Sequence, residues 1–163
     1  MVIELQFVGG RGLLSRMIAW FSHGWYVHVD SILPDGRLLG ARFDGGVLIR
    51  PEGYKKFFRI LKVTLPCNDD VTNKYYKFLY EQIGKPYDYK AAFGGFIFNS
   101  EWRNPNKWFC SELVAAGLEE AGYFKHQLFA CTNKIDPSAL LLILSALADI
   151  PSPWLRHKKI IYN

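Results

Sequence analysis

Two kinds of hydrophobic pattern divide the chain. Before residue 66, short runs of β-branched and aromatic side chains are bounded by Gly, Pro and Asp, which is typical of strands. The predicted strands are 3–8, 25–33, 37–41, 47–50 and 58–65. The turn residues Pro34, Asp35 and Gly36 join the second and third of these strands, so this part of the chain is predicted to form a hairpin.

After residue 66 the apolar positions recur with the spacing of a helix. Helices are predicted over 70–83, 110–121 and 136–147, and an earlier one over 13–21. Asp70 and Asp136 are predicted N-caps, and Gly84 and Gly122 are predicted to end the helices that they follow. Because most strands precede most helices, the order of elements predicts the α+β fold class.

Composition and charge narrow the range of functions. The chain has 163 residues, 50% of them hydrophobic and 21% charged, which fits one folded domain over 1–163 and excludes a disordered protein. The net charge of +5 comes from scattered Lys and Arg residues, and no DNA-binding motif accompanies them. A nucleic-acid partner is therefore not expected.

The three cysteines and the start of the chain bear on cofactors and location. Cys67, Cys110 and Cys131 are widely spaced, so neither a zinc site nor a disulfide framework is predicted, and no cofactor or metal is expected. The first ten residues lack the basic region of a signal peptide, and the longest apolar run, 139–148, is about half a membrane span. We expect a cytoplasmic protein without a transmembrane segment; a phage-associated protein would have the same features.

Cys110 is the first candidate for chemistry, because it lies where a loop is predicted to become a helix. The unpaired backbone N–H groups of a helix start stabilise a thiolate and can also bind an oxyanion. The alternative interpretation is a buried structural cysteine, which is the more common role of a free cysteine.

His28 is the second candidate, because it is an ionisable residue inside the apolar segment YVHVDSIL. Strand alternation predicts Tyr26, His28 and Asp30 on one face of this segment. A carboxylate two residues from a histidine could orient the imidazole and select its tautomer. The alternative interpretation is a core histidine whose hydrogen bonds are satisfied.

Five segments together resemble the circularly permuted branch of the NlpC-type cell-wall peptidases, which are papain-like. The resemblance extends from about residue 13 to about residue 144, and FCSEL after GKPYD is its most specific part. It rests on YVHV, PDGRLLGARFDGGVLIRP, GKPYDY, FCSELVAAGLEEAG and DPSAL. The order, with the histidine strand before the cysteine helix, is the feature that indicates permutation.

The resemblance implies a fold, a reaction and a site. It implies a papain-like fold in which an antiparallel sheet packs against the helix that carries the cysteine, in a single catalytic domain. Cys110 is then the nucleophile of an acyl-enzyme mechanism and His28 its base. Tyr87 of GKPYD is expected to line the active site and to donate to the oxyanion, and Tyr26 is a second predicted substrate-binding residue. The implied substrate is a peptide amide, in peptidoglycan or in another small peptide.

Two other functions remain open at this point. Relatives in the permuted group include acyltransferases and thioesterases that act on lipids, so a lipid acyl substrate is an alternative. A binding module that keeps the scaffold without catalysis is another.

The chain departs from the pattern of similar enzymes at the third polar residue. That residue stands on the strand after the histidine, and its place falls near Gly40, which has no side chain. Asp30 is the preferred substitute because it shares a strand face with His28, and Arg42 and Asp44 are weaker choices. Ser111, next to Cys110, is expected to cap the helix or to face solvent.

Overall fold

The computed structural model describes residues 1–10, 24–90, 104, 106–125, 128 and 135–147. The predicted helix over 13–21 lies outside the described residues. Cys131 and three of the four histidines, His23, His126 and His157, also lie outside them.

Five antiparallel strands form one sheet in the order β4-β3-β2-β1-β5. The strands are β1 (Val2–Gly9), β2 (His28–Ile32), β3 (Leu38–Arg42), β4 (Gly46–Arg50) and β5 (Arg59–Pro66). All five predicted strands are therefore confirmed. Most of their boundaries differ by one residue, and the largest error is in β2, which begins at His28 rather than at Trp25.

The described helices are α2 (Asp69–Glu81), α4 (Cys110–Glu120) and α5 (Pro137–Leu147). The predicted N-cap at Asp70 is wrong: the side chain of Asn68 caps α2 by accepting from the backbone N–H of Val71 at 2.9 Å. The predicted cap of α5 is confirmed, since Asp136 Oδ1 accepts from the backbone N–H groups of Ser138 and Ala139 at 2.7 and 2.9 Å.

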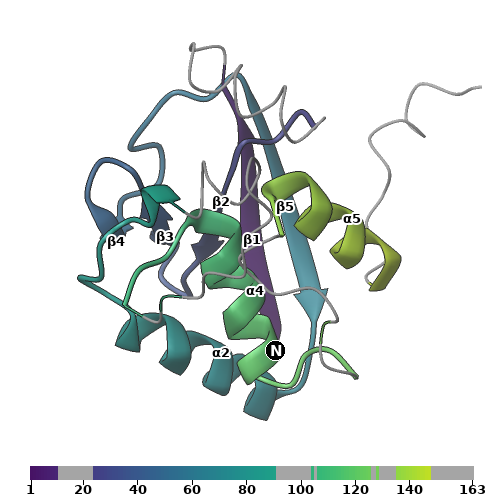
Figure 1. Ribbon diagram of the computed structural model, residues 1–163. Helices are drawn as coiled ribbons and strands as arrows, with labels where there is room; N and C mark the ends of the chain where they lie inside the picture. Colours follow the sequence, from purple (N-terminus) through teal and green to yellow (C-terminus); the bar gives the residue numbers. More distant parts are fainter. Residues whose placement is uncertain (11–23, 91–103, 105, 126–127, 129–134, 148–163) are drawn as a thin grey trace, which may run out of the picture.

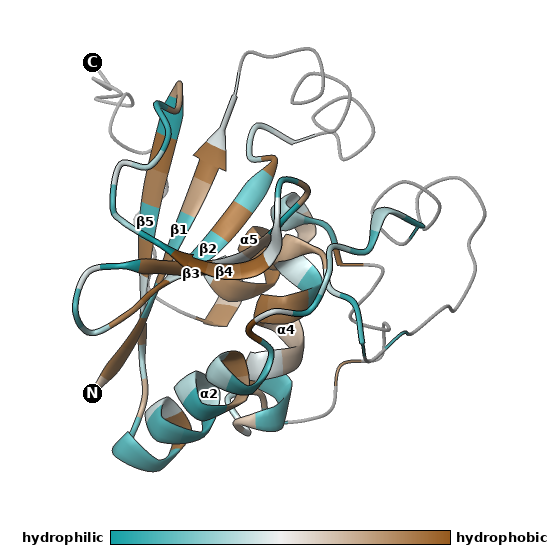
Figure 2. Cartoon of the chain, turned by 90° about the vertical axis from the view of Figure 1, so that its left-hand side faces the viewer, coloured by the Kyte–Doolittle hydropathy of each residue, from teal (hydrophilic) through white to brown (hydrophobic). Residues whose placement is uncertain are grey.

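The described helices pack on one face of the sheet and give an α+β architecture. In Figure 1, α4 lies against β2 and β3, α2 runs below it, and α5 lies on the side of β5. The strands are largely apolar, whereas α2 is hydrophilic along its outer side (Figure 2). Alternate strand residues such as Val29 and Leu39 enter the core with Leu113 and Leu118 of α4, and all four are fully buried.

A polar contact inside this core joins the sheet to α2. The hydroxyl groups of Ser31 and Tyr75 are 2.6 Å apart, and both residues are completely buried. Buried polar groups of this kind are stable only when they are paired. The contact therefore fixes how α2 sits on β2.

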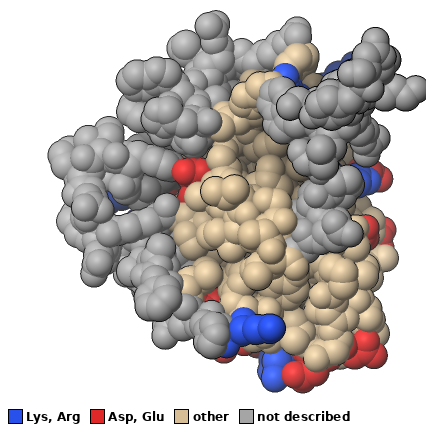
Figure 3. Space-filling view, turned by 90° about the vertical axis from the view of Figure 1, so that its right-hand side faces the viewer, with Lys and Arg blue, Asp and Glu red and all other residues tan. Residues whose placement is uncertain are grey.

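Charged side chains are scattered over the described part of the surface drawn in Figure 3. On the face drawn in Figure 3, the basic side chains lie apart and acidic ones are interspersed with them. This face therefore carries no continuous basic patch of described residues. Among the described helices, none is both long and apolar enough to cross a bilayer.

Candidate active site

Cys110 is the first residue of α4, as predicted, with Phe109 at the N-cap position. A carboxylate oxygen of Glu112 accepts from the backbone N–H of Phe109 at 3.5 Å, so this buried acid binds back to the start of its own helix. The free backbone N–H groups of the first turn give this end a partial positive charge. Cys110 is only 4% exposed and also contacts the apolar core.

The GKPYD segment runs between β4 and the start of α4. The backbone N–H of Asp88 donates to the carbonyl of Trp108 at 3.0 Å, and the N–H of Trp108 donates to the carbonyl of Pro86 at 3.2 Å. On the other side, a Cβ atom at Gly46 would lie 2.3 Å from the carbonyl oxygen of Lys85, so only glycine permits this approach. The segment thereby places Tyr87 beside the cysteine.

Tyr87 is partly buried and stays protonated. Burial raises the pKa of Tyr87 above its ordinary value, and the nearby sulfur of Cys110 raises it further. Its ring meets that of Tyr89 edge to face at 5.2 Å. Tyr87 is therefore a protonated phenol whose pKa responds to Cys110.

His28 and Asp30 form a buried pair. His28 Nε2 lies 2.8 Å from Asp30 Oδ1, and the two residues are 9% and 1% exposed. Nε2 is therefore the ring nitrogen that the carboxylate of Asp30 holds. The predicted neighbourhood of His28 and Asp30 is thus present.

Both Asp30 and Cys110 influence the pKa of His28. Burial alone would lower the pKa of His28, but the charge of Asp30 and the charge and hydrogen bond of Cys110 outweigh it and raise the pKa to about 9. Burial would raise the pKa of Asp30, yet His28, Tyr54 and Arg42 hold that pKa below its ordinary value. At neutral pH the pair is therefore an imidazolium and a carboxylate.

Gly40 explains how Asp30 fits. The register of β2 and β3 places Gly40 opposite Asp30, so their side-chain positions share one face. A Cβ atom at Gly40 would lie 2.0 Å from Asp30 Oδ1. The carboxylate of Asp30 thus occupies the space beside His28 that a side chain on β3 would fill.

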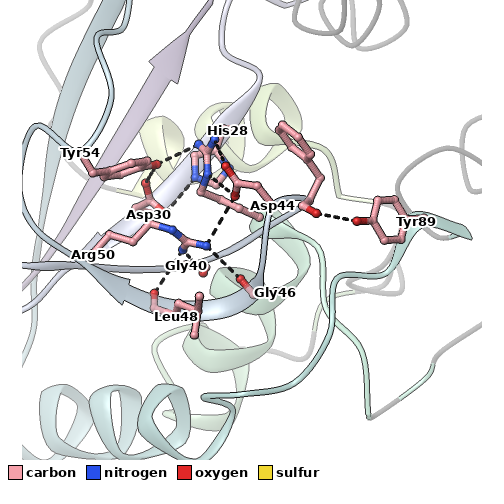
Figure 4. Close-up of polar contacts among 11 residues, drawn as sticks. His28, Asp30, Gly40, Asp44, Gly46, Leu48, Arg50, Tyr54 and Tyr89 are labelled. Atoms are coloured by element: carbon pink, nitrogen blue, oxygen red, sulfur yellow. Dashed lines mark hydrogen bonds and ion pairs between the residues drawn. The ribbon is translucent and has the colours of Figure 1, made fainter.

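Sequence reasoning missed Tyr54. The hydroxyl of Tyr54 donates to Asp30 Oδ2 at 2.9 Å (Figure 4). It accepts from Arg42 Nη1, also at 2.9 Å. Tyr54 lies in the 51–58 segment between β4 and β5, and no spacing in PEGYKKF indicates that its side chain reaches β2. Only the three-dimensional arrangement reveals it.

Arg42 and Asp44, the weaker choices for the third residue, pair with each other. The guanidinium of Arg42 donates to both carboxylate oxygens of Asp44 at 3.0 and 3.1 Å, and Arg50 approaches Asp44 at 3.6 Å. Asp44 is half exposed and Arg42 is buried. Arg42 therefore connects Asp44 to the hydroxyl of Tyr54, which in turn binds Asp30.

Tyr26 lies elsewhere than the predicted face. The alternation that was to place it beside His28 does not apply, because Tyr26 precedes β2. Its ring packs edge to face on Phe7 at 6.2 Å, and its carbonyl accepts from the hydroxyl of Ser138 at 3.4 Å. Phe7 is paired with Val29 and thus faces away from His28. The structure does not bring Tyr26 together with the His28 and Asp30 pair.

Ser111 also differs from the expectation. It is completely buried, and its hydroxyl has no hydrogen-bond partner among the described residues. The prediction that it caps the helix or faces solvent is therefore wrong.

Comparisons with known proteins add no relative. A scan against protein-family models finds no match, and a search of curated proteins finds no significant one. Within the described residues, no group of three or more His, Cys, Asp and Glu side chains is arranged to hold a metal ion.

Proposed function

We propose that this protein is a cysteine hydrolase that cleaves an amide bond through an acyl-enzyme on Cys110. The observation that carries the proposal is the buried pair of His28 and Asp30, together with the influence of Cys110, the first residue of α4, on the pKa of His28. A cysteine nucleophile needs a base and a third group that orients the base, and in this proposal His28 and Asp30 take these two roles. The resemblance to permuted NlpC-type, papain-like peptidases rests on segments that include His28 and Cys110, whereas Asp30 is the departure from their pattern.

In the first half of the reaction, Cys110 acts as a thiolate and His28 as an imidazolium. The thiolate of Cys110 attacks the carbonyl carbon, and a C–S bond forms as the carbonyl becomes an oxyanion. Backbone N–H groups of the first turn of α4 and the phenol of Tyr87 are the donors available to that oxyanion. The oxyanion then collapses, the C–N bond breaks, and His28 gives its proton to the departing nitrogen.

The second half regenerates the enzyme. Neutral His28 takes a proton from water while the water oxygen attacks the thioester carbon. The C–S bond then breaks, a carboxylic acid is released and loses its proton to solvent, and Cys110 is again a thiolate with His28 as an imidazolium. Asp30 stays ionised throughout and holds Nε2, and Nδ1 is the nitrogen that exchanges the proton in this mechanism.

A peptide in peptidoglycan, or another small peptide, is the proposed substrate. A second candidate keeps the chemistry but replaces the amide by a lipid acyl group. Its support is two half-exposed aromatic side chains on the side of Tyr87. They are Phe43 and Tyr89, and the hydroxyl of Tyr89 donates to the carbonyl of Phe43. The non-catalytic alternative loses its main support, because Asp30 takes the place left empty at Gly40.

Hydrolysis assays on two substrate panels test this function. We expect purified peptidoglycan or its peptides to release new amino groups with the wild-type protein and with Cys67→Ala, but not with Cys110→Ala. Release of fatty acid from an ester and thioester panel instead would favour the lipid candidate. Turnover that persists in Cys110→Ala, or no turnover on either panel by the wild-type protein, would contradict the proposal.

A further inference from the structure

Tyr54 stands between two charged side chains that attract each other. Its hydroxyl accepts from Arg42 Nη1 and donates to Asp30 Oδ2, both at 2.9 Å. Arg42 and Asp30 are 5% and 1% exposed, so little solvent separates them. An ion pair in such surroundings is strongly favoured over two separate charges once it can form.

We propose that Tyr54 is a positioning residue that keeps the carboxylate of Asp30 turned towards His28 and apart from the guanidinium of Arg42. This inference rests on the proposed roles of His28 and Asp30, and it assigns the residue that holds their geometry. Without the hydroxyl of Tyr54, Asp30 Oδ2 and Arg42 Nη1 each lose a partner in a buried site. The simplest way to satisfy both groups is to bring them into direct contact.

The surroundings of Tyr54 hold it in this position. Its backbone N–H donates to the carbonyl of Pro51 at 3.2 Å, and its ring meets Phe57 edge to face at 5.7 Å. The carboxylate of Glu52 binds Lys62 of β5 at 2.9 Å and joins the 51–58 segment to the sheet. The arrangement therefore fixes the hydroxyl before any substrate binds.

Asp44 holds the guanidinium of Arg42 in place. Asp30 is therefore the group that we expect to move when the hydroxyl of Tyr54 is removed. Two hydrogen bonds to Asp44 fix the guanidinium, and its carbon atom Cζ lies 5.0 Å from the centre of the Tyr54 ring. The other oxygen of Asp30, Oδ2, already points to the hydroxyl of Tyr54, which Arg42 also binds, so a small rotation brings the carboxylate towards the guanidinium. A carboxylate that turns to Arg42 leaves His28 Nε2 without its acceptor.

The consequence is measurable on His28 itself. The charged or titratable groups that face the His28 and Asp30 pair in the described part of the chain are Cys110 of α4, Arg42 of β3 and Tyr54. Tyr87 lies beside Cys110. Burial raises the pKa of Tyr54, and Asp30 raises it further, so its hydroxyl keeps the proton that it donates. Replacing Tyr54 by Phe removes this donor and no charge.

The test is an NMR titration of the His28 ring in the full chain, which needs no substrate. In Tyr54→Phe, we expect the pKa of His28 to fall by about one unit or more, because a lost carboxylate contact shifts a pKa by that order. Tyr80→Phe makes the same chemical change at an exposed position of α2 and should leave the pKa unchanged. An unchanged His28 pKa in Tyr54→Phe overturns the proposal.

A second variant separates this role from a merely structural one. Arg42→Gln removes the charge that attracts Asp30, so the double variant Tyr54→Phe/Arg42→Gln should recover most of the lost pKa. Failure to recover it in a folded double variant also overturns the proposal. A crystal structure of Tyr54→Phe gives an independent answer, with the carboxylate of Asp30 expected within about 4 Å of Arg42, the limit of an ion pair, and contradicted if it stays on His28. These readouts hold whether or not Cys110 hydrolyses any substrate, so they fail separately from the proposed function.

Discussion

Asp30 and Gly40 face each other across β2 and β3, and the carboxylate of Asp30 fills the space that a side chain at position 40 would need. A Cβ atom there would come within 2.0 Å of Asp30 Oδ1. The lack of a polar side chain at position 40 of β3 and the presence of Asp30 two residues after His28 are therefore linked, because only one of the two side chains fits. In the proposed enzyme, an acid on the strand of the histidine takes the orienting role that similar enzymes give to a polar residue on the neighbouring strand.

Substitution of Gly40 by Ala tests this relationship. The added methyl group displaces the Asp30 carboxylate from His28, so we expect kcat/KM to fall at least about tenfold. The His28 pKa, followed by NMR, should fall towards its ordinary value of 6.5.

The control for this substitution is the double variant Asp30→Ala/Gly40→Ala. Without the carboxylate there is no clash, so it should be no less stable than Asp30→Ala alone, and the two effects should not add. Additive losses of unfolding free energy would show that the methyl group added at position 40 acts through some other contact.

The pH dependence of turnover follows from the state of His28. The leaving nitrogen takes its proton from the imidazolium, and the pKa of His28 is about 9. We expect kcat/KM to stay high through neutral pH and to decline on an alkaline limb near 9. Rates measured from about pH 6 to about pH 10 check this, and a limb near the ordinary value of 6.5 would be incompatible with the ion pair.

The same pKa predicts how stability changes with pH. Below pH 6.5 His28 is protonated in both the folded and the unfolded chain, so its ion pair stabilises the fold fully. Between 6.5 and about 9 only the folded chain keeps the proton, and the unfolding free energy falls as the pH rises. The total loss is up to about 3 kcal/mol at about 1.4 kcal/mol per pKa unit.

Urea unfolding at a series of pH values measures this loss. The control is His28→Gln, which cannot titrate and should show a much flatter profile between pH 6.5 and about 9. If the wild-type protein and His28→Gln have parallel profiles, the imidazolium does not contribute to stability in the way described.

The buried pair of Ser31 and Tyr75 predicts a stability effect away from the site. Tyr75→Phe leaves the hydroxyl of Ser31 buried without its partner, which should lower the unfolding free energy by about 1–3 kcal/mol. Tyr80→Phe on the exposed side of α2 should change it by less than about 0.5 kcal/mol. Adding Ser31→Ala to Tyr75→Phe should restore part of the loss, and a further loss of similar size would argue against the pairing.

The sequence predicted the parts of the fold that local patterns determine. All five strands, the helix that begins at Cys110 and the cap at Asp136 follow from spacing and turn chemistry. The two local errors have local causes. Asn68 competes with Asp70 for the N-cap of α2, and the chain becomes extended strand only at His28, which removes Tyr26 from the expected face.

For the candidate site, the sequence pattern indicated Asp30 but neither Tyr54 nor the burial of Ser111, and the reason is physical. Asp30 could be chosen because strand alternation links residues two apart. Tyr54 is 24 residues further along, in a segment without a repeating pattern, and only the folding of 51–58 over β2 brings its hydroxyl to Asp30. The burial of Ser111 likewise depends on tertiary packing that helix spacing does not reveal.

The rate at which iodoacetamide alkylates Cys110 near neutral pH is the most direct test of the central claim, that the thiol of Cys110 is paired with His28. Mass spectrometry of digested protein reports Cys110 and Cys67 in the same sample. We expect Cys110 to react at least about ten times faster than Cys67, and His28→Gln to abolish the difference. Equal rates for the two cysteines in the wild-type protein, or an unchanged preference in His28→Gln, would contradict the claim.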